Sequence, residues 1–198
     1  MAAADRFWAF LMQQILRLHP DSVCAAVTQV EVEITRPHAE RLALAYVVTG
    51  RIGDLVMPAV VAPARTDDLW RHTCFEAFVG GSPDSAYYEF NFAPSTQWAA
   101  YQFSGHRSGM RVAAEIGDPG IEVQSSPEQY ILRVSLNTDE LLLPASGAER
   151  KGRAAWRLGL SAVIEEAGGR RSYWALAHPQ GRPDFHHSDC FALEVPEP

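Results

Sequence analysis

The side chains best suited to bind or transform a ligand lie in the middle of the chain. Along residues 86–92 the side chains of an extended strand alternate between two faces, so one face carries Tyr87, Glu89 and Asn91. The other face carries three large aromatic residues and is expected to join the core. A row of an aromatic ring, a carboxylate and an amide suits a polar, hydroxyl-rich ligand, and we take these three residues as candidates for its site.

A second carboxylate, Glu76, lies in the apolar segment 73–79 and shares its face with apolar neighbours. A buried carboxylate without a partner is costly. We therefore expect Glu76 to be paired with Arg71, with Arg107 or with a ligand hydroxyl. Arg107 lies in a short loop between two glycines, where polar side chains often bind ligands. Trp98 follows a turn, and we expect its ring either to pack in the core or to contact the ligand.

Three histidines, two aspartates and one cysteine lie within residues 178–190, which supplies ligand types for Zn²⁺ or Ni²⁺. The spacing does not match a helical His-x3-His pair or a Cys-x2-Cys clip. We therefore expect structural hydrogen bonds that fix a long loop, and predict no metal. His186 is kept as a candidate for a ligand pocket.

Enzyme motifs are absent from the sequence. It contains no Gly-x-Ser-x-Gly elbow, no phosphate-binding glycine loop and no dinucleotide-binding fingerprint. His72 and Cys74 share a strand face, and a thiolate needs an adjacent base, but this spacing alone does not indicate catalysis. We predict a protein without catalytic activity.

Composition narrows the function further. The chain has 198 residues, enough for one ordinary domain, and a net charge of −7 with a pI near 5.5. Nucleic-acid binding and electrostatic membrane binding usually need a basic surface, so we expect neither. The apolar stretch near the N-terminus is too short to span a bilayer, and the three cysteines form no clip. These features predict a cytoplasmic protein.

The elements that position these residues are predicted to be strands. About ten short segments with strand patterns and turn signals indicate an all-β fold, a two-sheet antiparallel β-sandwich of the jelly-roll or immunoglobulin-like type, over residues 27–198. The predicted strands cover residues 27–34, 42–46, 73–79, 86–92, 98–103, 112–116, 121–124, 130–136, 156–163, 172–177 and 191–195, with an edge strand at 56–61.

The N-terminal segment, residues 1–26, is predicted to contain a short amphipathic helix. The apolar residues Trp8, Leu11, Met12, Ile15 and Leu16 are placed at helical spacing. We expect this helix to pack on the β-domain.

Two runs resemble a known family. Residues 69–78 read Leu-Trp-Arg-His-Thr-Cys-Phe-Glu-Ala-Phe, and residues 87–94 read Tyr-Tyr-Glu-Phe-Asn-Phe-Ala-Pro. They resemble the DOMON-like superfamily, which includes family 9 carbohydrate-binding modules. Residues 184–192 resemble the His-containing segment before that family's last strand. The likeness covers residues 27–195, is greatest to a bacterial branch of unknown function, and implies a β-sandwich that binds a sugar or a haem without catalysis.

The resemblance also implies roles for particular residues. Family 9 modules hold a sugar between two tryptophans, and Trp70 matches the first of them. The segment that should carry the second has Phe185 instead, and Trp174 or Trp98 could substitute. Haem-binding relatives use a methionine and a histidine as axial ligands, but no histidine can be assigned to Met57 or Met110 from the sequence.

The sequence therefore predicts a non-catalytic module that binds a carbohydrate or an amino-sugar-containing small molecule and needs no cofactor. Two alternatives are a haem-binding electron-transfer domain, and a structural or interaction domain without a small ligand. The predicted ligand-binding residues are Trp70, Arg71, His72, Glu76, Tyr87, Glu89, Asn91, Trp98, Arg107 and His186.

Overall fold

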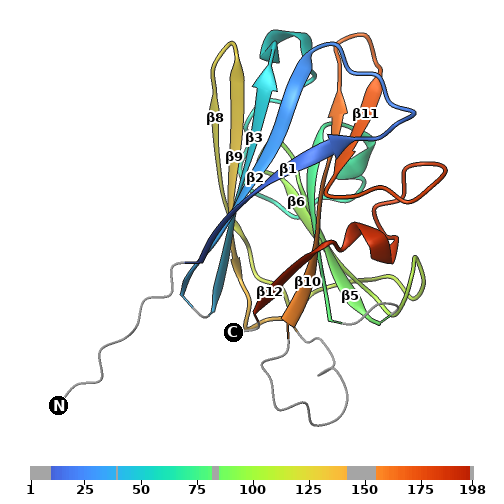
Figure 1. The fold of residues 1–198 in the computed structure, drawn as a ribbon. Coiled ribbons are helices and arrows are strands. Elements are labelled where there is room, and N and C mark those ends of the chain that lie inside the picture. Colours follow the sequence, from blue (N-terminus) through green and yellow to red (C-terminus); the bar gives the residue numbers. More distant parts are fainter. Residues whose placement is uncertain (1–9, 39, 82–84, 142–154, 197–198) are drawn as a thin grey trace.

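The computed structural model describes residues 10–38, 40–81, 85–141 and 155–196, and β-strands dominate this part of the chain (Figure 1). The strands are β1 (Phe10–Leu18), β2 (Val27–His38), β3 (Arg41–Gly50), β4 (Cys74–Gly80), β5 (Tyr87–Phe92), β6 (Trp98–Phe103), β7 (Arg111–Val112), β8 (Gly120–Ser125), β9 (Gln129–Asn137), β10 (Ala155–Glu165), β11 (Arg171–Ala175) and β12 (Leu193–Pro196). Three short 3-10 helices, η1 (Ile52–Asp54), η2 (Leu69–Arg71) and η3 (Ser188–Cys190), lie in the connections. No helix in the described ranges is long and apolar enough to span a membrane.

All pairings between the strands are antiparallel, so the prediction of an all-β antiparallel fold is confirmed. The strands form one continuous sheet in the order β7-β6-β5-β4-β10-β11-β1-β2-β3-β9-β8, and β12 also pairs with β10. The sheet curls strongly into a half barrel, so that its two halves face each other across the core (Figure 1). The predicted division into two separate sheets is not found, because hydrogen bonds join the halves.

The join between the halves is β1. Its residues 10–16 pair with β2, and its last two residues pair with β11, at Arg17↔Ala175 and Leu18↔Trp174. Figure 1 shows β1 running from the half that contains β2 and β3 towards β11. A single strand therefore holds together two halves that would otherwise be separate sheets.

The prediction of a helix near the N-terminus is wrong for residues 10–18, because these residues form β1. Trp8 lies outside the described residues. Leu16 faces the core, whereas Leu11 and Ile15 lie on the outer face and are 68% and 60% exposed. Apolar residues on both faces of a strand produce the same spacing as one face of a helix. Hydrogen-bonded pairing with β2 on one side and β11 on the other stabilises the strand conformation over a helix.

The edge strand predicted at residues 56–61 is also not formed. This stretch carries two prolines nearby, which cannot donate to a sheet, and Val60 and Val61 are exposed. Further on, residues 64–66 run beside the start of β6, where Trp98 N–H donates to the Ala64 carbonyl and Thr66 N–H to the Trp98 carbonyl. Residues 64–66 thereby pair with the start of β6, and the chain then continues to η2, whose Leu69 packs on the outer face of the sheet.

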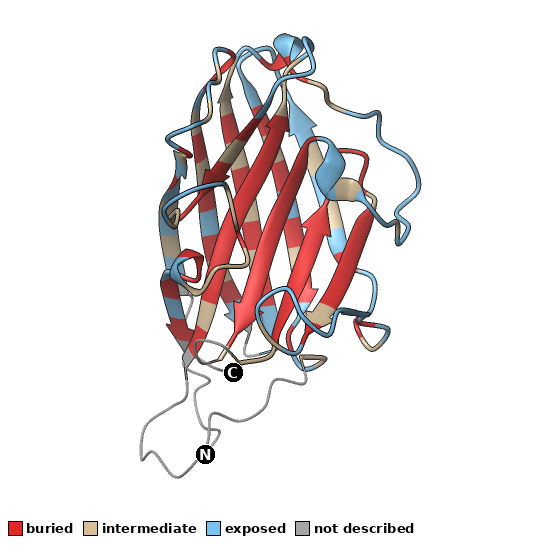
Figure 2. Ribbon diagram, turned by 90° about the vertical axis from the view of Figure 1, so that its right-hand side faces the viewer, coloured by how far each residue is buried: buried red, intermediate tan, exposed pale blue. Residues whose placement is uncertain are grey.

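The half that contains β4, β5, β6 and β10 is buried on both faces, as the block of buried strands in Figure 2 shows. Its inner face packs against the other half. Its outer face is covered by the closing loop, residues 176–192, which brings Phe185 and Phe191 onto it. The resulting second cluster consists of Phe78, Tyr87, Ala99, Tyr101, Phe103, Val163, Ala175, Phe185 and Phe191.

A pair of histidines, buried His19 and partly buried His178, ties the closing loop to the end of β1. The rings of His19 and His178 lie edge to face, 4.8 Å apart. His19 Nδ1 accepts a hydrogen bond from the Asp21 N–H, so its proton is assigned to Nε2, whereas His178 Nε2 donates to the Arg17 carbonyl, which leaves Nδ1 bare. Both remaining nitrogens are buried and have no partner among the described residues. The two rings thus present one unbonded donor and one unbonded acceptor, and the rings themselves are in contact.

Acid should weaken this contact. Burial lowers the pKa of His178, and the charges of His19 and Arg17 add to this effect. Between the lowered folded pKa and the ordinary value of 6.5 the unfolded chain binds more protons than the folded chain, so stability falls as the pH drops through this range. We expect the melting temperature of the wild type to exceed that of His178→Gln by more at pH 7.5 than at pH 5.5. A gap independent of pH, measured by circular dichroism, would contradict the assignment.

Tyr46 links the two halves through the core. Its ring is fully buried, and its hydroxyl donates to the carbonyl of Glu76 on β4 at 2.7 Å. We expect Tyr46→Phe to lower the free energy of unfolding by about 1 kcal/mol, because the buried carbonyl loses a donor. Urea denaturation measures the change. Tyr173→Phe is the control, since the Tyr173 hydroxyl has no hydrogen bond in the described residues, and equal effects of the two substitutions would refute the prediction.

Candidate functional site

The candidate carboxylates meet on the outer face of β4 and β5. The register of the sheet places Glu76 opposite Asn91 on β5 and opposite Ser161 on β10. Glu89 lies two residues before Asn91 and shares its face. The predicted row is therefore formed, but its members are covered: Glu76, Glu89 and Asn91 are only 4%, 6% and 1% exposed. The closing loop and the aromatic cluster beneath it cause this burial, which strand alternation alone does not reveal.

Both carboxylates have hydrogen-bond partners. Ser161 Oγ donates to Glu76 Oε2 at 3.2 Å, and Asn91 Nδ2 donates to Glu89 Oε1 at 2.7 Å. Burial, reinforced by the charge of Glu89, raises the pKa of Glu76 to about 8. Burial also raises the pKa of Glu89, against the hydrogen bond from Asn91 and the charge of Arg107. Glu76 therefore holds a proton at neutral pH, when its carboxyl group can donate as well as accept a hydrogen bond.

His186 closes the row from the loop side. Its ring packs against Phe78, Tyr87 and Phe103, with centroids 5.0–5.9 Å apart. Its Nδ1 lies 2.8 Å from the Tyr87 hydroxyl and its Nε2 lies 3.7 Å from Glu89 Oε2. Burial lowers the pKa of His186 to about 3, so the ring is neutral. Because the Tyr87 oxygen accepts the Arg107 N–H, we assign its proton to the bond with Nδ1, which leaves His186 Nε2–H directed to Glu89.

Arg107 connects this buried network to the surface. Its Nε and Nη2 donate to Asp184 Oδ1 at 3.0 and 2.8 Å, and His106 Nε2 lies 2.9 Å from Asp184 Oδ2. Partial burial opposes ionisation of Asp184, but the hydrogen bonds from Arg107 and His106 outweigh it and lower its pKa. The backbone of Arg107 has a positive φ of 50°, which a non-glycine residue adopts only when its surroundings enforce it.

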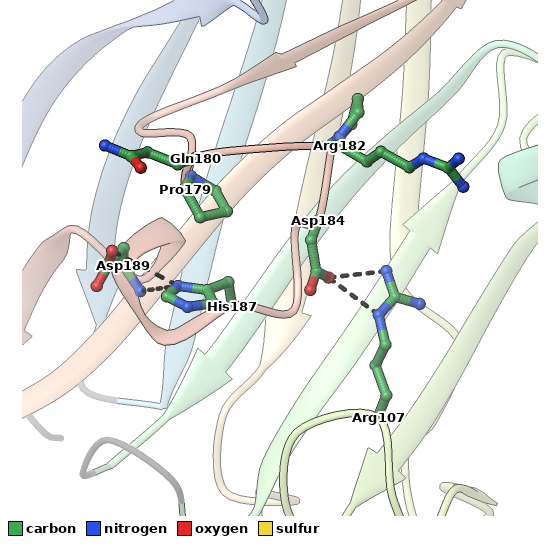
Figure 3. A pocket seen from close by; sticks show the side chains of 8 residues that line it. Arg107, Pro179, Gln180, Arg182, Asp184, His187 and Asp189 are labelled. Atoms are coloured by element: carbon green, nitrogen blue, oxygen red, sulfur yellow. Dashed lines mark hydrogen bonds and ion pairs between the residues drawn. The ribbon is translucent and has the colours of Figure 1, made fainter.

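The Arg107–Asp184 pair forms one wall of an open pocket of about 680 Å³ (Figure 3). The closing loop supplies the rest of the lining, from residues 179–189. Arg182, Gln180, His187 and Asp189 are polar members of this lining. The sequence offers Asp184 only as a possible metal ligand and gives no sign of Arg182, because nothing in a loop sequence shows which side chains share a pocket.

Trp70 lies on η2 and is 47% exposed. The preceding residue, Leu69, packs against the outer-face cluster and anchors the turn. The Arg71 guanidinium lies 5.5 Å from the centroid of the Trp70 ring and also pairs with Asp68 at 3.3 Å. Asp68 has a positive φ of 64°. The ring of Trp70 is thus an accessible aromatic surface on a well-fixed turn.

The structure does not bring every predicted residue to this region. Trp98 is 1% exposed on the inner face, under the guanidinium of Arg65. His72 is bonded to Glu165 Oε2 at 2.7 Å, and the Cys74 thiol bonds to Asn91 Oδ1 at 3.4 Å. Burial raises the pKa of the Cys74 thiol far above its ordinary range, so the thiol stays protonated. The pair weighed as nucleophile and base is therefore absent.

The substitutes considered for a second stacking ring are buried as well. Trp174 belongs to the inner core, and Phe185 belongs to the outer-face cluster. Of the methionines weighed as haem ligands, Met57 packs against the core, whereas Met110 is exposed. Trp70 is the one tryptophan among the described residues that remains a large exposed surface.

Comparison with known proteins gives a fold but no family. The chain matches no family model and no curated protein sequence. Its structure is similar to that of a candidate carbohydrate-binding protein from Bacteroides uniformis, with a TM-score of 0.59 and 14% identity, over 89% of this chain and 82% of the other. It is also similar to a family 9 carbohydrate-binding module from Caldicellulosiruptor kristjanssonii in complex with cellotriose, with a TM-score of 0.51 and 10% identity, over 86% and 75% of the two chains. The expected likeness to these modules thus holds at the level of the fold.

Proposed function

We propose that this protein is a non-catalytic carbohydrate-binding module. The observation that carries the proposal is Trp70, a half-exposed ring on η2, whose neighbour Leu69 packs against the outer-face cluster, in a fold shared with a module solved with cellotriose. The apolar C–H face of a sugar ring packs well on an aromatic ring, and a small number of polar groups then fixes its orientation. The proposed ligands are carbohydrates and amino-sugar-containing small molecules.

The residues of the proposed site have two roles. Trp70 and Arg107 are accessible and contact the ligand. Glu89 and Tyr87 are buried and support the contact residues: Glu89 lies against His186, and the Tyr87 hydroxyl accepts the backbone N–H of Arg107. The buried network therefore fixes the wall of the site, in the way that hydrogen-bonded supporting residues orient contact residues in other binding sites.

The buried polar groups do not support a catalytic function. Glu76 and Glu89 are covered, Cys74 is a protonated buried thiol, and His72 is bonded to Glu165. General acid–base catalysis needs such groups within hydrogen-bond reach of a substrate. The arrangement fits recognition, in which a wall held rigid by hydrogen bonds is an advantage.

Replacing Trp70 tests the proposal directly. We expect Trp70→Ala to weaken binding of glucose, cellobiose or N-acetylglucosamine at least tenfold, about 1.4 kcal/mol, and Trp70→Phe to retain part of the affinity. Titration calorimetry measures the affinity. Ile15→Ala, at an exposed apolar position on β1, is the matched control and should bind like the wild type. No heat from any sugar with the folded wild type, or equal affinity in Trp70→Ala, would reject this proposal.

The state of Glu76 can be tested through stability. The unfolded chain releases this proton near pH 4.5, whereas the folded chain keeps it until about pH 8. The wild type therefore loses stability relative to Glu76→Gln as the pH rises from 4.5 to 8, and the difference levels off above that range.

Melting temperatures of the two proteins across this range measure the effect, with Glu33→Gln, at an exposed position on β2, as the control. A difference between wild type and Glu76→Gln that does not change with pH would show that folding does not raise the pKa of Glu76.

A further inference from the structure

The pocket beside Asp184 is chemically divided. Figure 3 shows the guanidinium groups of Arg107 and Arg182 on the same side of Asp184, whereas Gln180, His187 and Asp189 lie on the other. Two cationic groups that come from different loops therefore border one part of the pocket. Arg107 belongs to the loop after β6, and Arg182 belongs to the closing loop.

Hydrogen-bond donors outnumber acceptors on this side. Arg107 uses its Nε and Nη2 on Asp184, so its Nη1 group is unbonded within the described residues. Arg182 is exposed and makes no hydrogen bond or ion pair in the part of the chain that the structure describes. A guanidinium group has five N–H donors and no acceptor, and it matches a carboxylate or phosphate geometrically.

The two acidic residues do not cancel this excess. Asp184 Oδ1 accepts from Arg107 and from the His186 N–H, and Oδ2 bonds to His106, so its charge and both oxygens are already engaged. His187 Nδ1 accepts the Asp189 backbone N–H at 3.2 Å, and the Asp189 carboxylate lies on the other side of Asp184 from the two guanidinium groups (Figure 3). On the side of the pocket that carries the guanidinium groups, the unpaired charge among the described residues is the positive charge of Arg182.

We propose that the ligand is an acidic saccharide, whose anionic group binds between Arg182 and the free edge of Arg107. This inference rests on the proposed function and specifies its ligand class. A neutral sugar would leave Arg182 without a partner of opposite charge. A sugar that bears a carboxylate or a phosphate supplies several acceptor oxygens and the compensating charge. Charge-assisted hydrogen bonds to such groups are about twice as strong as neutral ones.

Calorimetric titration of the full chain with glucuronate, glucose 6-phosphate and glucose tests this inference. We expect at least one acidic sugar to bind at least fivefold tighter than glucose at low salt, and the preference to shrink with added salt because the site is open to solvent. Comparison of the two acidic sugars tells whether a carboxylate or a phosphate is preferred.

The Arg182→Gln variant should reduce this preference to within twofold, and Arg182→Lys should retain part of it. Arg170→Gln is the matched control, since it changes the net charge equally at an exposed residue of the turn between β10 and β11, and it should keep the full preference. Equal affinities for glucose and both acidic sugars, or a preference unchanged in Arg182→Gln, would overturn the inference and leave the proposed function intact. Binding of none of the three sugars to the wild type would overturn both.

Discussion

Burial of β4, β5 and β10 on both faces is the constraint on which the rest of the structure depends. The inner face of these strands fills the core of the curled sheet, and the closing loop covers the outer face. Two glutamates on that outer face consequently lose their water. Such groups are tolerated only when they are hydrogen-bonded or neutral. The structure uses both solutions, because Ser161 and Asn91 bond the two carboxylates and Glu76 keeps its proton at neutral pH.

This buried network also organises the surface above it. Glu89 lies against His186, the Tyr87 hydroxyl lies between His186 and the Arg107 backbone, and Arg107 is tied to Asp184. These contacts join β5 to the closing loop, β5 to the loop after β6, and the two loops to each other. The position of the exposed Arg107 guanidinium therefore depends on buried residues of this network. Polar networks of this kind specify one arrangement when every member is bonded.

The strands β2 to β6 and β8 to β12 follow from local patterns, as does the face shared by Glu89 and Asn91. Trp70 could also be selected, through its place in the resemblance. In contrast, β1 was predicted to be a helix, because apolar residues on both sides of a strand imitate helical spacing. Its identity depends on β2 and β11, which are close to it only in the folded chain. Because β1 joins the two halves, the prediction of a helix there also led to the prediction of two separate sheets.

The sequence by itself determined the strand-rich architecture, the alternation that brings aromatic and polar side chains to defined faces, and the absence of enzyme motifs. These properties depend on neighbours along the chain. Only the tertiary structure decided that the polar row is covered, that Trp98 is a core residue and that Arg107, Asp184 and Arg182 share a pocket. Burial and loop contacts arise between residues separated by about a hundred positions or more, as with Tyr87 and His186 or Arg17 and His178, and no local pattern encodes them.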